Sequence, residues 1–325
     1  MERVQRVVRA VEPHDSVERY TGLGVEVIED AAKIVSPWEV EVTRNGGGCE
    51  RLTTRSIVIA AGARPFVPPI PGIEETGYLT SDTVWNLREL PRRLVVLGGG
   101  PIGSELTQAF ARFGAKVTQV EMAPRILIRE DAEVSEIVTR RFREEGIDVL
   151  VNHKAKQFLI ENGEKVLVAE HDGRDVRIPF DAVLVAVGRV ANLKGYGLEE
   201  LDIPAGRTVD TNEYLQTRYP NIYAAGDVAG PFQFTHTVAH QAWYAAVNAL
   251  FDPFRKFKAD YAVIPWATFI EPEVARVGLN KILGTIHIYP TLAEANKYVA
   301  GVWKKAHAPQ RLLAWVERFH AWRRG

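Results

Sequence analysis

The sequence contains a single cysteine, Cys49, and no long apolar run. A lone cysteine excludes an intramolecular disulfide or a Cys-x-x-Cys redox pair within these 325 residues. A helix that crosses a bilayer needs about 20 predominantly apolar residues, so no transmembrane segment is expected. The stretch MERVQRVVRAVEPHDSVERY is charged throughout and lacks the apolar centre of a signal peptide, which makes the cytoplasm the expected location.

An excess of charge of one sign is also lacking over the chain as a whole. The 40 Lys and Arg residues balance 41 Asp and Glu residues, and this gives no indication of a nucleic-acid partner. Residues 281–325 are basic, and the last 16 residues carry an apolar stripe at helical spacing. The stripe consists of Leu312, Trp315, Val316, Phe319 and Trp322. It predicts a terminal helix packed on the body of the protein or on a second subunit, and a membrane-surface helix is the alternative.

The clearest functional motif lies in RRLVVLGGGPIGSELTQAFARFGAKVTQVE, residues 92–121. An apolar strand precedes Gly98, Gly100 and Gly103 in G-x-G-x-x-G spacing, and a helix and a second strand that ends in Glu121 follow. The first glycine permits a tight turn, the second lets the backbone approach a pyrophosphate, and the third allows close helix–strand packing. A carboxylate at position 121 would accept from a ribose 2′-OH and repel a 2′-phosphate, which favours NAD over NADP.

Strands and helices alternate around this motif, which predicts an α/β fold with a doubly wound parallel sheet. Helices are expected within the first 30 residues and at 101–113, 133–144 and 235–250. Strands are expected at 25–28, 39–43, 57–60, 94–97, 115–120, 147–151, 156–160, 165–171, 175–178, 182–187 and 222–226. The Pro-rich run after Arg64 predicts an extended crossover between domains.

Three of the apolar strands end in glycine, at Gly62, Gly188 and Gly226. Nucleotides approach a doubly wound sheet at such strand ends. Asp227 follows the last of them, and a carboxylate there accepts hydrogen bonds from a ribose or polyol. The spacing alone leaves open whether Asp227 binds a ligand or caps a turn.

Five segments, taken in order, resemble the FAD-dependent pyridine nucleotide–disulfide oxidoreductase family, which includes dihydrolipoamide dehydrogenase and mercuric reductase. They are IVIAAGARPFVPPIPGI, GGGPIGSE, VAVGRVANL, TNEYLQTRYPNIYAAGDV and PWATFIEPEVARVGL. The resemblance implies a Rossmann-like NAD domain inserted in an FAD domain and followed by an α+β interface domain that mediates homodimerisation. The implied domains are a partial FAD domain (1–70), the NAD domain (71–192), the second FAD part (193–262) and a truncated interface domain (263–325).

The resemblance also assigns residues to the two cofactors, FAD and NAD. The FAD contacts it implies are Ala61, Gly62, Asp227 on the ribityl chain, and His236 at the start of a flavin-side helix. The NAD contacts are Gly98, Gly100, Gly103, Glu121 and Gly188. Glu105 matches a helix glutamate that pairs in the family with a lysine beside the flavin, and that lysine is absent from this chain.

The family's catalytic groups are only partly matched. Its first FAD fingerprint and C-x-x-x-x-C disulfide are absent from these residues, and the middle of its interface domain is missing. Tyr289 replaces the histidine that moves a proton to the family's thiol, and Glu294 matches the glutamate that orients it. His287, two positions earlier, is the alternative base, and a surface position for it is equally open.

The activity implied by the resemblance is hydride transfer from NADH to FAD and then to a disulfide or metal–thiolate acceptor. Disulfide reduction by this chain alone is expected to be absent, because the dithiol is lacking. One alternative is a non-catalytic NAD-binding fragment, or half of a split enzyme whose FAD half comes from another chain. A second alternative is a dithiol-free NADH:quinone or dye reductase.

Overall fold

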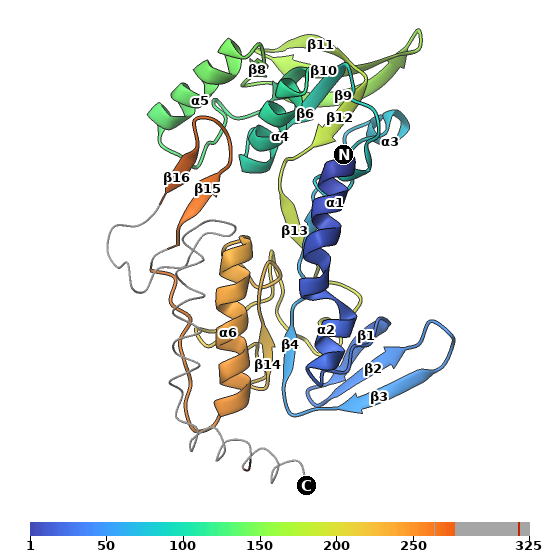
Figure 1. Ribbon diagram of the computed structural model, residues 1–325, viewed down its shortest axis with the longest axis vertical. Helices are drawn as coiled ribbons and strands as arrows, with labels where there is room; N and C mark the ends of the chain where they lie inside the picture. Colours follow the sequence, from blue (N-terminus) through green and yellow to red (C-terminus); the bar gives the residue numbers. More distant parts are fainter. Residues whose placement is uncertain (263, 277–317, 319–325) are drawn as a thin grey trace.

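The computed structural model describes residues 1–262, 264–276 and 318 of the chain. It shows an α/β fold in which two units are joined by the strands β5 (Ala63–Pro65) and β13 (Arg189–Ala191) (Figure 1). The upper unit in Figure 1 carries β6 and α4, which flank the glycine motif, and the lower unit carries β4, β14 and α6. Among the described residues, no helix is long and apolar enough to cross a membrane.

The first unit is built on a parallel sheet of four strands. In spatial order these are β12 (Ala182–Val185), β6 (Arg93–Leu97), β7 (Lys116–Val120) and β8 (Asp148–Leu150). The helices α4 (Pro101–Arg112) and α5 (Ala132–Glu144) make the crossovers between them. Leu94 through Leu97 are all buried, as expected of a central parallel strand that is covered on both faces. The strands and helices predicted for this unit are therefore confirmed.

A three-stranded antiparallel sheet packs on one face of the parallel sheet. Its strands are β9 (Lys154–Glu161), β10 (Glu164–His171) and β11 (Arg174–Phe180). The two turns that connect them, Asn162-Gly163 and Asp172-Gly173, have positive φ at both residues, which suits the right-handed twist of a hairpin. Phe158 and Phe180 pack edge to face in a core shared with the parallel sheet. The antiparallel arrangement predicted for these strands is confirmed.

The second unit combines an antiparallel sheet with a short parallel pair. The antiparallel strands are β1 (Ala31–Ser36), β2 (Glu39–Thr43) and β3 (Cys49–Thr53), and the parallel strands are β4 (Ile57–Ile59) and β14 (Ile222–Ala224). Ile34 of β1 packs with Ile59 and Ile222 in one core, and α6 (Thr235–Phe251) contacts the pair through a second core that includes Tyr223 and Ala245. The hairpin predicted through Asn45-Gly-Gly-Gly48 is confirmed as β2–β3.

The chain makes two of its passages between the two units side by side. It leaves through β5 and returns through β13, and these strands pair antiparallel, with Val190 opposite Arg64. The Pro-rich run after Arg64 contains no helix before α3 (Ile73–Thr76), as predicted for an extended crossover. The two connections therefore lie side by side and are bonded to each other.

The segment that follows the second unit returns to the first. The hairpin of β15 (Trp266–Thr268) and β16 (Val274–Arg276) lies beside α4 and α5 in Figure 1. Ile270 and Val274 are buried in a core with Phe142 of α5. The first unit therefore carries residues from two distant parts of the sequence.

The N-terminal segment departs from the sequence prediction. The helices α1 (Glu2–Val11) and α2 (Val17–Gly22) form, and neither of them contains a buried residue. The strand predicted at Val25–Ile28 is wrong, because this segment has no ladder of backbone hydrogen bonds. Val25 and Val27 are 48% and 37% exposed. An alternating pattern becomes a strand only when a neighbouring strand pairs with it, and the described residues supply none here.

Candidate nucleotide-binding sites

The loop between β6 and α4 is shaped by two glycines that cannot be replaced without strain. Gly98 has φ of +116°, and a Cβ atom there would lie 2.4 Å from the carbonyl oxygen of Ala186. A Cβ atom on Gly103 would lie 2.2 Å from the carbonyl oxygen of Gly98. The first glycine thus makes the turn, and the third lets α4 approach β6 closely.

Gly100 is different from these two glycines. Its φ is −76°, which any residue adopts, and a Cβ atom there would meet no atom within 4 Å. The space in front of its backbone is open, and α4 begins at the next residue, Pro101. Free backbone N–H groups and the helix dipole make such a helix start favourable for phosphate. The loop therefore fits the pyrophosphate of a dinucleotide.

Glu121 lies directly beside this loop, at the end of β7. Its Oε2 accepts a hydrogen bond from the N–H of Gly99 at 2.6 Å, and its Oε1 accepts one from the N–H of Ala123 at 2.7 Å. Both oxygens keep a free lone pair, so the carboxylate can hold the loop and still accept from a sugar hydroxyl. The structure thus brings together Gly98, Gly100, Gly103 and Glu121, the NAD residues predicted by the motif.

A second group of predicted residues gathers at the ends of β4 and β14. The two strands are parallel, and the N–H of Ala225 donates to the carbonyl oxygen of Ile59, so Ala61 and Asp227 follow the same edge. Gly62 has φ of +67°, and a Cβ atom there would meet no atom within 4 Å. Burial raises the pKa of Asp227, and the Arg189 guanidinium, with its Nε 3.7 Å from Oδ2, acts in the opposite direction.

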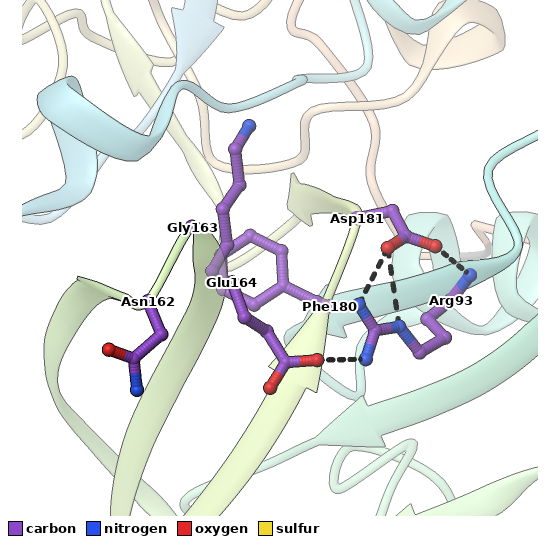
Figure 2. A pocket seen from close by; sticks show the side chains of 7 residues that line it. Arg93, Asn162, Gly163, Glu164, Phe180 and Asp181 are labelled. Carbon is purple, nitrogen blue, oxygen red and sulfur yellow. Dashed lines mark hydrogen bonds and ion pairs between the residues drawn. The ribbon is translucent and has the colours of Figure 1, made fainter.

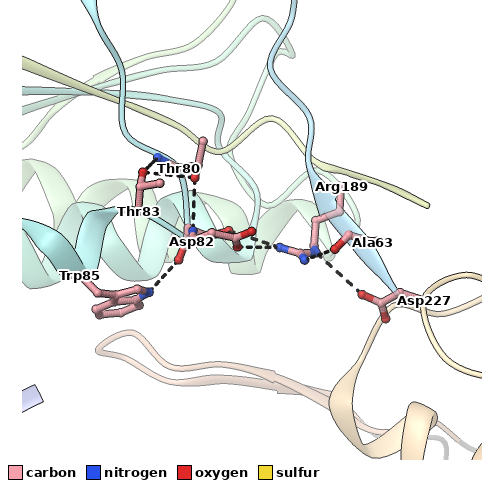
Figure 3. A network of polar contacts seen from close by, with 8 residues as sticks. Ala63, Thr80, Asp82, Thr83, Trp85, Arg189 and Asp227 are labelled. Atoms are coloured by element: carbon pink, nitrogen blue, oxygen red, sulfur yellow. Dashed lines mark hydrogen bonds and ion pairs between the residues drawn. The ribbon is translucent and has the colours of Figure 1, made fainter. Parts of the chain in front are cut away.

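Arg189 connects the two units, and sequence reasoning did not assign it a role. Figure 3 shows its guanidinium between Asp82 of the first unit and Asp227 of the second. Its Nη2 also donates to the carbonyl oxygen of Ala63 at 2.7 Å, on the opposite connecting strand. Gly188, the preceding residue, has φ of +134° and accepts a hydrogen bond from the N–H of Phe66.

Gln241 is a second residue that sequence reasoning missed. It is fully buried in α6, and its Oε1 accepts from the N–H of Gly226 at 2.6 Å, which fixes the turn before Asp227. Its Nε2 donates to the hydroxyl of Tyr261 at 2.9 Å. The sequence feature that could have pointed to Gln241 is a polar glutamine in a helix that has no Asp, Glu, Lys or Arg.

The start of α6 holds another predicted residue. His236 is buried, and its ring stacks on that of Phe234 with centroids 5.3 Å apart. The Oγ1 of the next residue, Thr237, is buried without a hydrogen-bond partner in the described part of the chain. An unsatisfied buried hydroxyl costs free energy in a folded protein.

Glu105 lies on α4, two residues after Gly103. Its Oε1 accepts from the N–H of Phe269 at 2.8 Å, so its partner is the segment between β15 and β16. Burial raises the pKa of the Glu105 carboxyl, and the bond from Phe269 lowers it by a smaller amount. The structure therefore gives Glu105 a partner other than a lysine.

Three predicted residues, Tyr289, Glu294 and His287, lie outside the described residues, as does the apolar stripe from Leu312 to Trp322. Within residues 1–262, 264–276 and 318, no group of three His, Cys, Asp or Glu side chains is arranged to hold a metal ion.

A surface pocket on the first unit is a less suitable site. Figure 2 shows Arg93 of this pocket between Asp181 and Glu164. Asn162 and Phe180 also line the pocket. Arg93 donates to Asp181 at 2.7 Å and to Glu164 at 2.6 Å, so its charge is already compensated. Arg93 begins β6, so this pocket lies at the edge opposite to the glycine loop. It is best explained as a structural ion-pair network.

Comparison with known proteins agrees with this geometry. Residues 3–249 match the family described as Pyridine nucleotide-disulphide oxidoreductase. The mercuric reductase of Staphylococcus aureus is 37% identical over 270 residues, which are 82% of this chain and 47% of that protein. The dihydrolipoyl dehydrogenase of Bacillus subtilis is 33% identical over 271 residues, which are 82% of this chain and 56% of that protein. The chain thus spans about half the length of these relatives.

Solved structures show the same similarity. The HOCl-induced flavoprotein disulfide reductase RclA of Escherichia coli superposes with a TM-score of 0.70 and 32% identity, covering 78% of this chain and 57% of that one. LpdA of Mycobacterium tuberculosis gives a TM-score of 0.75 and 26% identity, covering 86% of this chain and 61% of that one. The family match extends over both units and includes the glycine loop and Asp227. The chain therefore belongs to the pyridine nucleotide-disulphide oxidoreductase family.

Proposed function

We propose that this chain binds NADH at the glycine loop and FAD at the ends of β4 and β14, as part of a flavoprotein oxidoreductase. In this proposal residues 71–192 form the NAD domain, residues 1–70 and 193–262 form the FAD domain, and residues 263–325 belong to an interface domain. The family membership supports the proposal, and so do the two groups of residues that gather at strand ends.

The observation that carries the NADH half is the combination of Gly100 and Glu121. An open space in front of the Gly100 backbone is suited to a pyrophosphate, and the carboxylate beside it is suited to a ribose. Glu121 would accept from the 2′-OH while it holds the N–H of Gly99, so one side chain would fix both the sugar and the loop. A 2′-phosphate would be repelled by the same carboxylate.

For the flavin half, Gly62, Ala61 and Asp227 would hold FAD, with Asp227 accepting from its ribityl chain. The open space at Gly62 fits a bound polar group. When bound, the flavin would take a hydride from NADH and pass the electron pair to an acceptor. Arg189 would keep Asp227 ionised as an acceptor, because its positive charge opposes the effect of burial on the Asp227 pKa.

The acceptor in the parent family is a disulfide or a metal–thiolate. Cys49 is the only thiol in the sequence, and it lies exposed at the start of β3. The 325 residues therefore supply no pair of thiols, and we expect no disulfide reduction by this chain alone. Tyr289 would occupy the place of the family's histidine beside Glu294, but a tyrosine, with an ordinary pKa of about 10, is unsuited as a base at neutral pH. His287 would instead move the proton of the acceptor. A homodimer formed in the cytoplasm would complete the assembly.

Replacing Glu121 with alanine is expected to weaken NADH binding at least tenfold, because a hydrogen bond to a charged group contributes roughly 1.5–3 kcal/mol. Isothermal titration calorimetry with NADH and NADPH measures both affinities. Glu121→Gln is the matched control, since it keeps an acceptor for Gly99 but removes the charge. We expect Glu121→Gln to narrow the preference for NADH over NADPH. Equal NADH affinities of all three proteins would contradict the proposed site.

Reconstitution with FAD tests the flavin half. We expect the purified chain to retain a flavin absorption band after gel filtration, and Asp227→Ala to lose it, because that variant lacks the ribityl acceptor. A colourless chain that still binds NADH would instead support the non-catalytic alternative. A coloured chain that reduces a quinone or dye with NADH would support the dithiol-free reductase.

A further inference from the structure

A fully buried glutamine lies beneath the glycine loop. Gln119 belongs to β7, and the buried residues Val117 and Val120 of the same strand are apolar, as is usual for a strand that is covered on both faces. The Oε1 of Gln119 is buried without a hydrogen-bond partner in the described part of the chain, whereas its Nε2 donates two hydrogen bonds. A buried polar atom without a partner lowers the stability of a folded protein. An apolar residue would avoid that cost, so the bonds that Nε2 donates indicate a role in shaping the loop.

Gln119 and Glu121 hold the two ends of one peptide group. Side chains two positions apart lie on the same face of a strand, and both of these reach the loop between β6 and α4. The Nε2 of Gln119 donates to the carbonyl oxygen of Gly98 at 3.1 Å. The Oε2 of Glu121 accepts from the N–H of Gly99 at 2.6 Å. This carbonyl oxygen and this N–H belong to the same planar peptide and point in opposite directions, so the peptide plane is fixed at both ends.

This peptide plane needs such support, because a glycine stands on each side of it. Glycine reaches most backbone conformations, so a peptide between two glycines rotates easily. A rotated plane would present the carbonyl oxygen of Gly98 to the carboxylate of Glu121, and neither of these groups can donate a hydrogen bond. The bond from Gln119 opposes this rotation and thereby keeps the Gly99 N–H available to Glu121.

The carbonyl oxygens of the loop are also bound inside the protein. That of Gly98 accepts from Gln119, and that of Gly99 accepts from the N–H of Leu127 at 2.7 Å. Both donors belong to buried residues. The two oxygens are therefore turned away from the open space in front of Gly100, where backbone N–H groups would attract a pyrophosphate.

We propose that Gln119 is a positioning residue of the NADH site. It holds the peptide between Gly98 and Gly99 in the orientation that presents the Gly99 N–H to Glu121, and Glu121 in turn meets the ribose. Gln119 touches no ligand itself, and its effect on NADH passes through the loop and through Glu121. The inference rests on the proposed function, since it gives Gln119 a part in binding the same dinucleotide.

The test compares Gln119→Met with the unmodified chain. Methionine has about the length and volume of glutamine, but it has no N–H to donate to Gly98 and no amide oxygen to leave unsatisfied. Thr107→Val is the matched control, because Thr107 is fully buried in α4 and its Oγ1 has no hydrogen-bond partner among the described residues. This control removes a buried polar atom from the helix that follows the loop, without changing a bond to the loop itself.

Gln119→Met is expected to bind NADH about fivefold more weakly, which corresponds to the loss of one ordinary hydrogen bond. Its preference for NADH over NADPH should narrow, because Glu121 is held less firmly. Its melting temperature should change by less than about 2 °C, since removal of the unsatisfied Oε1 offsets the lost bonds. In the absence of NADH, the buried Gly99 amide should exchange its hydrogen faster in Gln119→Met than in the unmodified chain, as measured by NMR. Thr107→Val should keep both the NADH affinity and the protection of this amide.

Two kinds of result would contradict the inference. A fall in melting temperature of more than about 5 °C with an unchanged coenzyme preference would make Gln119 a structural residue only. A Gly99 amide that stays protected in Gln119→Met would show that Glu121 alone fixes the peptide plane. Absence of NADH binding by the unmodified chain would refute the proposed function and this inference with it, whereas NADH binding that Gln119→Met leaves intact would refute the inference alone.

Discussion

Gly103→Val is expected to abolish NADH binding and to lower the melting temperature by about 10 °C. Any Cβ atom at this position lies 2.2 Å from the Gly98 carbonyl oxygen, so α4 must move away from β6. Overpacking of this kind costs roughly 3 kcal/mol, and each kcal/mol corresponds to about 2–4 °C in a protein of this size. Calorimetric melting and an NADH titration measure the two effects.

Gly100→Val is the matched control for this prediction. Gly100 has an ordinary φ and open space around its Cβ position, so the melting temperature should change by less than about 1 °C. NADH affinity should nevertheless fall at least tenfold, because the valine side chain would occupy the space proposed for the pyrophosphate. Unchanged affinity in Gly100→Val would place the dinucleotide elsewhere. An unchanged melting temperature in Gly103→Val would show that the packing of α4 is less strict than the geometry indicates.

Arg189→Met is expected to destabilise the protein by about 2 kcal/mol and to weaken FAD binding at least tenfold. The substitution removes the hydrogen bond to Ala63 and the contacts with Asp82 and Asp227. A hydrogen bond to a charged group contributes about 1.5–3 kcal/mol. The ion pairs are partly exposed to solvent and add little, so the expected loss of stability lies near the lower end of that range. Without Arg189, burial alone would act on the Asp227 pKa, which would then rise further. Urea unfolding and a flavin fluorescence titration test this prediction.

Arg64→Met is the control for Arg189, because Arg64 lies on the paired strand β5 and donates an exposed hydrogen bond to Asn192. We expect it to change the free energy of unfolding by less than about 0.5 kcal/mol. If both variants behave alike, the connecting strands themselves, and not the Arg189 contacts, hold the two units together. Loss of stability in Arg189→Met without any change in flavin affinity would limit Arg189 to a structural role.

The parts of the fold that depend on local sequence were predictable. The glycine loop, α4 and the strands beside it follow from spacing over a few residues, because each glycine meets a steric need that its neighbours create. The hairpin turns at Asn162 and Asp172 carry residues that tolerate positive φ. The position of Glu121 beside Gly99 follows from parallel strands that end at one edge of the sheet.

Features that depend on distant residues were not predictable. Val25 to Ile28 has the alternating pattern of a strand, but a strand also requires a neighbour, and local sequence does not report one. Arg189 and Gln241 act through residues that are distant in the sequence, namely Ala63 and Asp82 for the first and Gly226 for the second. The contact of Glu105 with Phe269 likewise joins residues 164 positions apart.

The paired connection of β5 and β13 has a mechanical consequence. A single connecting strand would swivel freely about its bonds, whereas two strands bonded to each other behave as a ribbon that bends in one direction and resists twisting. The ribbon is tied at both ends, since Asn192 donates to the carbonyl oxygen of Gly62 and Phe66 donates to that of Gly188. Displacement of one unit would therefore pull on the backbone turns at Gly62 and Gly188, which belong to the two proposed nucleotide sites.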